Sequence, residues 1–137
     1  MRRFPAGGRA VPQIGWNGIK RKKDSSLFSD YHDEKVYFVH SYHVPLDVVE
    51  DEWLLCTTDY GVEFVSGIQK GNIAALQFHP EKSGKAGLAI LENFLKNDGL
   101  QLNNRQLPDE SKKTELAKRI IACLDVRSND AGDLVVT

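Results

Sequence analysis

The chain has 137 residues, of which 41% are hydrophobic and 27% are charged, and both fractions are usual for a globular domain. Its 18 basic and 19 acidic side chains give a net charge of −1, so electrostatics give no reason to expect nucleic acid or an anionic membrane as a partner. No apolar run approaches the roughly 20 residues that span a bilayer, so no membrane span is predicted. Cys56 and Cys123 lack the spacing of a disulfide framework or a zinc site, so neither is predicted.

Glycine and proline punctuate the first twenty residues: Gly7, Gly8, Pro12, Gly15 and Gly18. This composition predicts a loop, which is expected to continue through the basic run 20–23 and the polar residues 24–26. A basic run without interleaved aromatic residues is interpreted as a solvated surface, and a nuclear or nucleic-acid signal is the alternative.

Four segments rich in β-branched and aromatic residues predict strands, at residues 36–44, 53–57, 62–68 and 72–78. Short turns at 59–61 and 70–72 separate the last three, so consecutive strands are expected to pair as antiparallel neighbours.

After Gly84 the apolar period becomes helical. Leu88, Leu91 and Leu95 form one stripe, with Ile90 and Phe94 beside it. Gly99 is the expected C-cap of this helix.

A polar segment at 98–115 predicts a linker between a first domain, 1–97, and the start of a second domain, 116–137. The apolar run 120–124 is typical of a strand buried on both faces of a parallel sheet, and it ends at Asp125. A lone parallel strand is not stable, so we expect its partners downstream or in a larger assembly.

The segment Gln77-Phe78-His79-Pro80-Glu81 carries the strongest chemical signal. Pro80 disfavours helix at His79, and residues two apart in an extended chain point the same way. His79 and Glu81 are therefore expected side by side at a strand exit, where the carboxylate accepts the Nδ1 proton and leaves Nε2 free as a base. The alternative is a strand end leading into a helix N-terminus, where Glu81 is favoured by the helix dipole.

Four segments of the sequence carry a resemblance to known proteins. Residues 78–83, Phe-His-Pro-Glu-Lys-Ser, resemble the histidine and glutamate signature of class I glutamine amidotransferases. Residues 12–17 and 37–42 resemble two further motifs of the glutaminase of histidine biosynthesis, and residues 116–127 resemble the opening strand of the cyclase that this glutaminase feeds. The chain thus resembles the middle of the bifunctional imidazole glycerol phosphate synthases. One departure is Gln13, which stands where the family usually has histidine.

The resemblance implies an α/β fold: the C-terminal half of a class I glutamine amidotransferase domain, with a mixed sheet and flanking helices, and the first strand of a (β/α)8 barrel. It implies that His79 is the general base and acid of glutamine hydrolysis and that Glu81 orients it. Asp125 matches a catalytic acid of the cyclase, at the end of a barrel strand where such barrels place their chemistry.

Weaker assignments follow from the same resemblance. Ser41 and Tyr42 lie where the glutamine backbone is held, and Trp16, Tyr37 and Lys82 lie near the domain interface through which ammonia passes. At a sheet margin, such residues can equally serve packing and solvation.

The implied partners are glutamine and, through a cyclase barrel that this chain does not contain, phosphoribulosyl aminoimidazole carboxamide ribonucleotide; no cofactor is implied. The family's nucleophilic cysteine has no counterpart, because Cys56 lies within a strand pattern without the glycines of a strained turn and is expected in the core. We therefore expect the isolated fragment to be inactive. The alternative is a non-catalytic binding or regulatory remnant, and the expected location is cytoplasmic or, alternatively, plastid.

Overall fold

The computed structural model of the chain describes residues 1–5, 7–96, 126–128 and 134–136. The chain divides into two units, Met1–Arg105 and Gln106–Thr137. The predicted linker, the Gly99 cap, Cys123, the strand at 120–124 and Asp125 lie outside the described residues.

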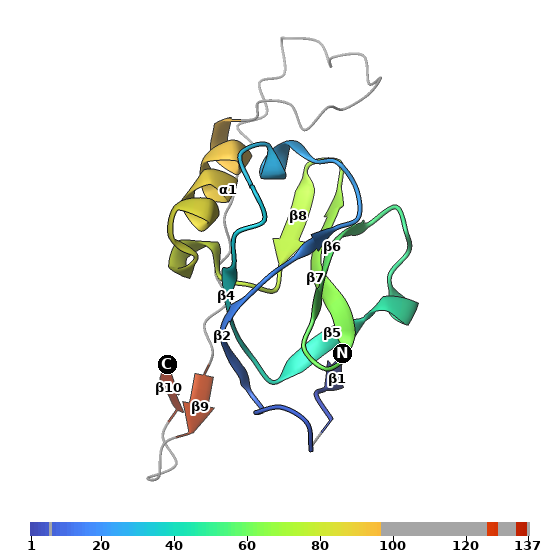
Figure 1. Ribbon diagram of the computed structural model, residues 1–137, viewed down its shortest axis with the longest axis vertical. Helices are drawn as coiled ribbons and strands as arrows, with labels where there is room; N and C mark the ends of the chain where they lie inside the picture. Colours follow the sequence, from blue (N-terminus) through green and yellow to red (C-terminus); the bar gives the residue numbers. More distant parts are fainter. Residues whose placement is uncertain (6, 97–125, 129–133, 137) are drawn as a thin grey trace. The chain divides into compact units, whose positions relative to one another are not determined.

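The first unit contains strands, one described α-helix and short 3-10 helices (Figure 1). The strands are β1 (Arg2–Arg3), β2 (Gln13–Asn17), β3 (Lys20–Arg21), β4 (Val36–His40), β5 (Tyr42–Pro45), β6 (Leu54–Asp59), β7 (Glu63–Lys70) and β8 (Ile73–Leu76). The helices are η1 (Ser26–Phe28), η2 (Leu46–Val48), η3 (Pro80–Lys82) and α1 (Gly84–Lys96). In the second unit, β9 (Val126–Ser128) and β10 (Leu134–Val136) pair as antiparallel neighbours.

Strand β7 organises the main sheet, whose order is β1-β5-β7-β6-β3 with β8 also paired to β7. One edge of β7 pairs with β6. The other edge is shared, because β5 pairs with Phe64 and Val65 while β8 pairs with residues 67–70. The longest described strand is thus bordered on both sides.

The predicted antiparallel hairpins are confirmed. Strands β6 and β7 are joined through the turn at 60–62, and β7 and β8 through Gly71, whose φ of +58° is readily adopted by glycine. All pairings between the described strands are antiparallel, so they do not include the parallel pairing that a mixed sheet requires.

The single strand predicted at 36–44 is wrong, because the chain divides at Ser41 into β4 and β5, which lie in different sheets. Alternate residues of β4 are buried at even positions, whereas His43 and Pro45 of β5 are buried at odd positions. This shift by one residue turns β5 toward another partner. The Ser41 carbonyl accepts a hydrogen bond from the Phe4 backbone N–H at 3.1 Å.

The loop predicted for the first twenty residues is wrong at β1 and at β2, and β2 pairs with β4 along five residues. The burial in β2 runs against hydropathy: Gln13 is 2% exposed, whereas Ile14 and Trp16 are 63% and 54% exposed. The hydropathy pattern of residues 13–17 therefore does not indicate a strand that faces the core. The predicted continuation of the loop through 20–26 is wrong at both ends, because β3 (Lys20–Arg21) pairs with β6 and η1, which buries Leu27 and Phe28, begins at Ser26.

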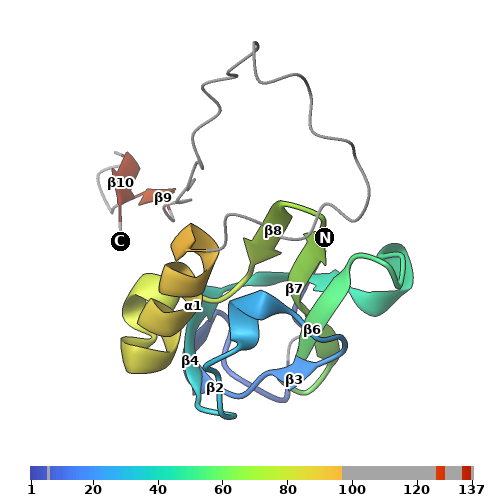
Figure 2. The same ribbon diagram turned by 90° about the horizontal axis from the view of Figure 1, so that it is seen from above.

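The core lies between the sheet and α1, and phenylalanine rings meet edge to face within it. Helix α1 buries Ala86, Gly87 and Ile90, whereas Leu88 and Leu95 of the predicted stripe are exposed. Ile90 and Phe94, predicted beside that stripe, do pack on the core, so the inward face is rotated from the leucine stripe toward these two residues. Figures 1 and 2 show α1 beside the β2–β4 ladder, away from β6, and α1 also contacts η1 and η3.

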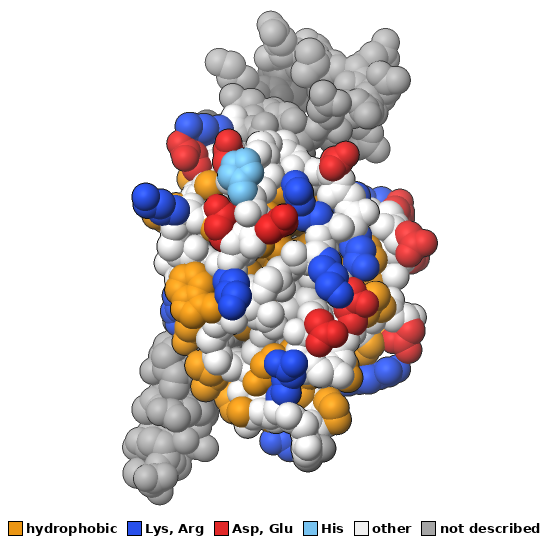
Figure 3. All heavy atoms as spheres, viewed as in Figure 1, with side chains coloured by type: hydrophobic (Ala, Val, Ile, Leu, Met, Phe, Trp, Pro, Cys, Tyr) orange, Lys and Arg blue, Asp and Glu red, His pale blue; other side chains and the backbone are white. Residues whose placement is uncertain are grey.

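Basic and acidic side chains are interspersed on the face shown in Figure 3, as the near-zero net charge leads one to expect. Among the described helices, none is both long and apolar enough to cross a membrane.

Candidate active site

The loop after β8 brings His79 against strand β4. The His79 backbone N–H donates to the Tyr37 carbonyl at 2.9 Å, which forms an isolated antiparallel bridge. Pro80 begins η3 and leaves His79 in extended conformation, with φ −97° and ψ 99°. The sequence thus fixes His79 at a junction between extended chain and a helical turn.

His79 and Glu81 form the expected contact. The Nδ1 atom of His79 lies 2.8 Å from the Glu81 carboxylate oxygen Oε1. Since a carboxylate accepts, Nδ1 donates the proton in the neutral tautomer and Nε2 keeps a free lone pair. The side chains are 21% and 56% exposed, so the dyad lies at the surface, where a ligand can reach it.

The pKa of the Glu81 carboxyl is lowered from its ordinary value of 4.5. Partial burial is the largest single influence and would raise this pKa. The hydrogen bond from His79, a backbone hydrogen bond and the charges of His79 and Lys82 together outweigh it. Glu81 is therefore ionised at neutral pH and suited to accept the Nδ1 proton.

Trp16 and Tyr37, two of the three residues predicted at a domain interface, contact each other across the β2–β4 ladder. They are register partners, and their rings meet edge to face with centroids 5.9 Å apart. The third, Lys82, is exposed, and its backbone N–H donates to the His79 carbonyl at 3.1 Å. Tyr37 and Lys82 are therefore hydrogen-bonded to the backbone of His79, and Trp16 lies beside Tyr37.

Ser41 and Tyr42 lie at the other end of β4 from the bridge at Tyr37. Four residues of extended chain separate Tyr37 from Ser41, or about 13 Å. Tyr42 is 53% exposed and pairs with the amino-terminal strand through Arg3. The described contacts do not bring these two residues to the dyad.

The prediction that Cys56 packs in the core is confirmed, since its side chain is fully buried. Burial raises the pKa of this thiol to about 12, despite a contact with the Ser66 hydroxyl. Its thiolate is therefore scarce at neutral pH, and Cys56 does not meet the requirement for a nucleophile. Asp125 lies outside the described residues.

Sequence reasoning missed two residues at this site, Ser83 and Gly87. Ser83 is 2% exposed and is hydrogen-bonded to His79 and Tyr37. Gly87 is buried where α1 meets η3. Small residues in the eight positions after His79 were the available signal, because small side chains allow close approach of backbones.

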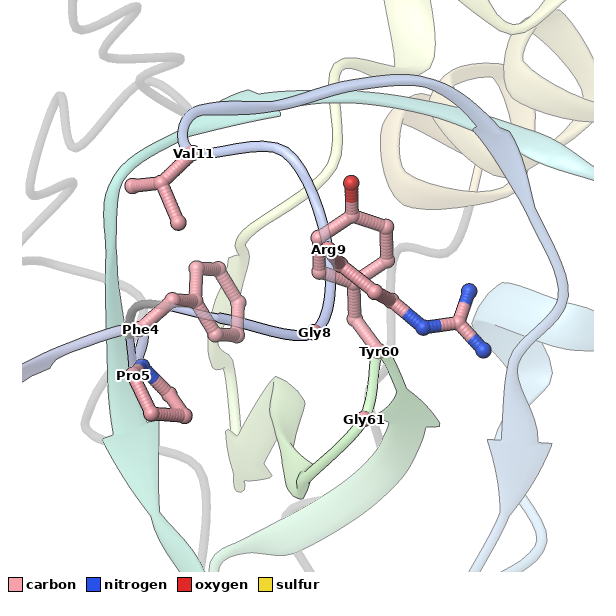
Figure 4. Close-up of a pocket in the computed structure, with 7 residues that line it drawn as sticks. All are labelled: Phe4, Pro5, Gly8, Arg9, Val11, Tyr60 and Gly61. Atoms are coloured by element: carbon pink, nitrogen blue, oxygen red, sulfur yellow. The ribbon is translucent and has the colours of Figure 1, made fainter.

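A small pocket lies elsewhere, between the amino-terminal segment and the turn after β6 (Figure 4). Phe4, Val11 and Tyr60 form apolar walls, and the Arg9 guanidinium carbon lies 5.1 Å from the centroid of the Tyr60 ring. The pocket contains none of the predicted site residues. Within the described ranges, no group of three histidine, cysteine or carboxylate residues is placed to hold a metal ion.

Comparison with known proteins identifies the family. The sequence model of the family "Glutamine amidotransferase class-I" matches residues 7–97. The chain is 52% identical to "Imidazole glycerol phosphate synthase hisHF, chloroplastic" of Arabidopsis thaliana, over 98% of this chain and 22% of that protein. It is 47% identical to "Imidazole glycerol phosphate synthase hisHF" of Schizosaccharomyces pombe, over 100% of this chain and 27% of that protein. It is 51% identical to "Imidazole glycerol phosphate synthase subunit HisH" of Deinococcus radiodurans, over 69% of this chain and 44% of that protein.

The chain therefore belongs to the class I glutamine amidotransferase family. The resemblance inferred from residues 12–17, 37–42 and 78–83 is confirmed, and these three relatives are all named imidazole glycerol phosphate synthase. The chain spans 22% and 27% of the two fused relatives and 44% of the separate HisH subunit.

Proposed function

We propose that this chain is part of an imidazole glycerol phosphate synthase of L-histidine biosynthesis and contributes the base of its glutaminase site. The observation that carries the proposal is the 2.8 Å contact between His79 Nδ1 and Glu81, which leaves Nε2 as a base at the surface. The names of the relatives support the pathway.

In the proposed reaction a cysteine thiolate attacks the side-chain amide carbon of glutamine. His79 Nε2 takes the thiol proton and gives it to the leaving ammonia, and water then hydrolyses the thioester. Glu81 holds the ring in the required tautomer. The nucleophile comes from residues outside this chain, because Cys56 is buried with a raised pKa and Cys123 falls in the segment 116–137 that is assigned to the cyclase part.

The remaining assignments belong to the same proposal. Ser41 and Tyr42 contact the glutamine backbone, and Trp16, Tyr37 and Lys82 form the margin through which ammonia passes. Residues 1–97 form the glutaminase part, 98–115 a linker, and 116–137 the start of a cyclase barrel with Asp125 as its acid. The barrel joins ammonia to phosphoribulosyl aminoimidazole carboxamide ribonucleotide.

We propose a cytoplasmic location, with the plastid as the alternative because the Arabidopsis relative is named chloroplastic.

The test is a chimera in which this chain replaces the matching segment of the Arabidopsis relative. Ammonia release from glutamine is measured for the chimera, for His79→Ala and for the control His32→Ala, which removes an exposed histidine of a loop. We expect activity in the chimera and the control, and a loss of at least about 1,000-fold in His79→Ala.

A folded chimera that releases no ammonia would instead favour a non-catalytic binding or regulatory remnant. Full activity in His79→Ala would contradict the proposal that His79 is the base. A chimera that releases ammonia but forms no imidazole glycerol phosphate would separate the glutaminase assignment from the cyclase assignment.

A further inference from the structure

The hydroxyl of Ser83 joins the His79 loop to strand β4. Its Oγ donates to the His79 carbonyl at 2.6 Å and accepts from the Tyr37 backbone N–H at 3.0 Å. The residue is 2% exposed, so water does not replace these bonds. One hydroxyl therefore connects the two backbone segments that the bridge brings together.

The Ser83 hydroxyl completes a clamp on the backbone of His79. The His79 N–H donates to Tyr37, and the His79 carbonyl accepts from both the Ser83 hydroxyl and the Lys82 N–H. The His79 ring, in contrast, is held through Glu81, whose side chain is 56% exposed. The direction of the ring therefore depends on how firmly the buried backbone bonds hold the residue.

Helix capping does not account for this hydroxyl. In the first turn of α1, the Gly87 N–H donates to the backbone carbonyl of Ser83 at 3.2 Å, and both hydroxyl bonds go to His79 and Tyr37. The Ser83 N–H in turn donates to the Pro80 carbonyl at 3.0 Å. The backbone of Ser83 thus makes hydrogen bonds within η3 and α1, whereas its hydroxyl makes hydrogen bonds with His79 and Tyr37.

The packing of α1 keeps Ser83 in this position. A Cβ atom added at Gly87 would lie 1.8 Å from the Pro80 carbonyl oxygen and 2.7 Å from the Ser83 Cβ. Backbone therefore packs directly on backbone here, and the loop cannot shift toward the helix.

We propose that Ser83 is a positioning residue of the glutaminase site: its hydroxyl fixes the backbone of His79 against β4 and thereby the direction of His79 Nε2. This inference rests on the proposed function for its effect on turnover. Its effect on the His79 ring can be measured without turnover.

The first experiment uses the 137-residue chain with ¹⁵N-labelled histidine. At about pH 8 the two ring nitrogens distinguish a fixed Nδ1–H tautomer from a mixture. We expect His79 to show the fixed tautomer in the wild type and in Ser83→Thr, and a mixture in Ser83→Val. Threonine and valine have nearly the same shape and differ in the hydroxyl, so any cost of the added methyl is common to both. An unchanged tautomer in Ser83→Val would overturn the proposal.

The second experiment measures kcat and KM for glutamine in the chimera described above. We expect Ser83→Val to lower kcat about tenfold relative to Ser83→Thr with KM within about twofold, because small misplacements of a base affect the chemical step. Ser29→Ala is the matched control, since the Ser29 hydroxyl also donates to a nearby carbonyl, Ser26 at 2.9 Å, but in η1. Equal kcat in the Val and Thr variants would overturn the positioning role. If the chimera itself is inactive, the proposed function fails, and the tautomer measurement still decides the role of the hydroxyl.

Discussion

Phe4 and His43 stack with ring centroids 4.6 Å apart and ring planes at 21°. Phe4 is 5% exposed and also contacts Phe64 and Tyr60 edge to face. The fourth residue of the chain is therefore part of the aromatic core. The amino-terminal strand β1 is held against β5 through this ring.

We expect Phe4→Ala to lower the free energy of unfolding by about 3 kcal/mol, because it removes a buried ring and leaves a cavity. Denaturant titration followed by circular dichroism measures the change. Arg3→Ala, which alters an exposed residue of the same segment, is the control and should stay within about 0.5 kcal/mol. A Phe4→Ala value as small as the control would mean that the segment does not stabilise the fold.

Gly87→Ala should destabilise the chain by about 3 kcal/mol or more, since the added methyl overlaps the Pro80 carbonyl and the backbone has to move. Gly18→Ala is the matched control, because a Cβ at Gly18 would meet no atom within 4 Å. Denaturant midpoints of the two variants give the comparison. Similar midpoints would show that α1 and the His79 loop are not packed as closely as described.

Glu81→Gln should change how stability depends on pH. The folded-state pKa of Glu81 is lowered, so its carboxylate stabilises the fold above the unfolded-state pKa, and this contribution is lost as pH falls through the folded-state value. The difference in unfolding free energy between wild type and Glu81→Gln should be largest above about pH 5 and shrink in more acidic solution. Glu92→Gln, an exposed carboxylate paired with Lys96 on α1, is the control. A difference that does not vary with pH would contradict the assigned contact.

Cys56 should resist thiol reagents in the folded chain, because it is fully buried and burial raises its pKa to about 12. In a Cys123→Ser background, a disulfide reagent such as DTNB at about pH 8 should modify less than a tenth of the chain in the time that modifies the unfolded chain fully. Rapid modification of the folded chain would contradict the burial of Cys56 and would show that it is a reactive thiol.

The dyad was predictable because its geometry is local. Pro80 restricts the conformation of His79, and two-residue spacing then places Glu81 beside it. The hairpins β6–β7 and β7–β8 were predictable for a similar reason, since turn residues separate segments of strand composition.

The features that the sequence did not predict depend on contacts with residues far away in the chain. Strand β2 exposes Ile14 and Trp16 and buries Gln13, so its hydropathy does not show which face meets the core. The break at Ser41 follows from β5 pairing with β7, and the inward face of α1 follows from its contact with η3. Ser83 was missed as a site residue because its role arises from two bonds to Tyr37 and His79, and Tyr37 is 46 residues away.

The shared edge of β7 has a consequence for amide hydrogen exchange. Strand β6 pairs with one edge of β7, whereas β5 and β8 share the other edge. The amides of β7 therefore become accessible to exchange with solvent only when the sheet separates. The two-residue strands β1 and β3, at the ends of the sheet order, are open to local fraying. Deuterium uptake measured by mass spectrometry should therefore be slowest in the peptide that contains Phe64 to Gln69, where it reports the opening of the entire sheet.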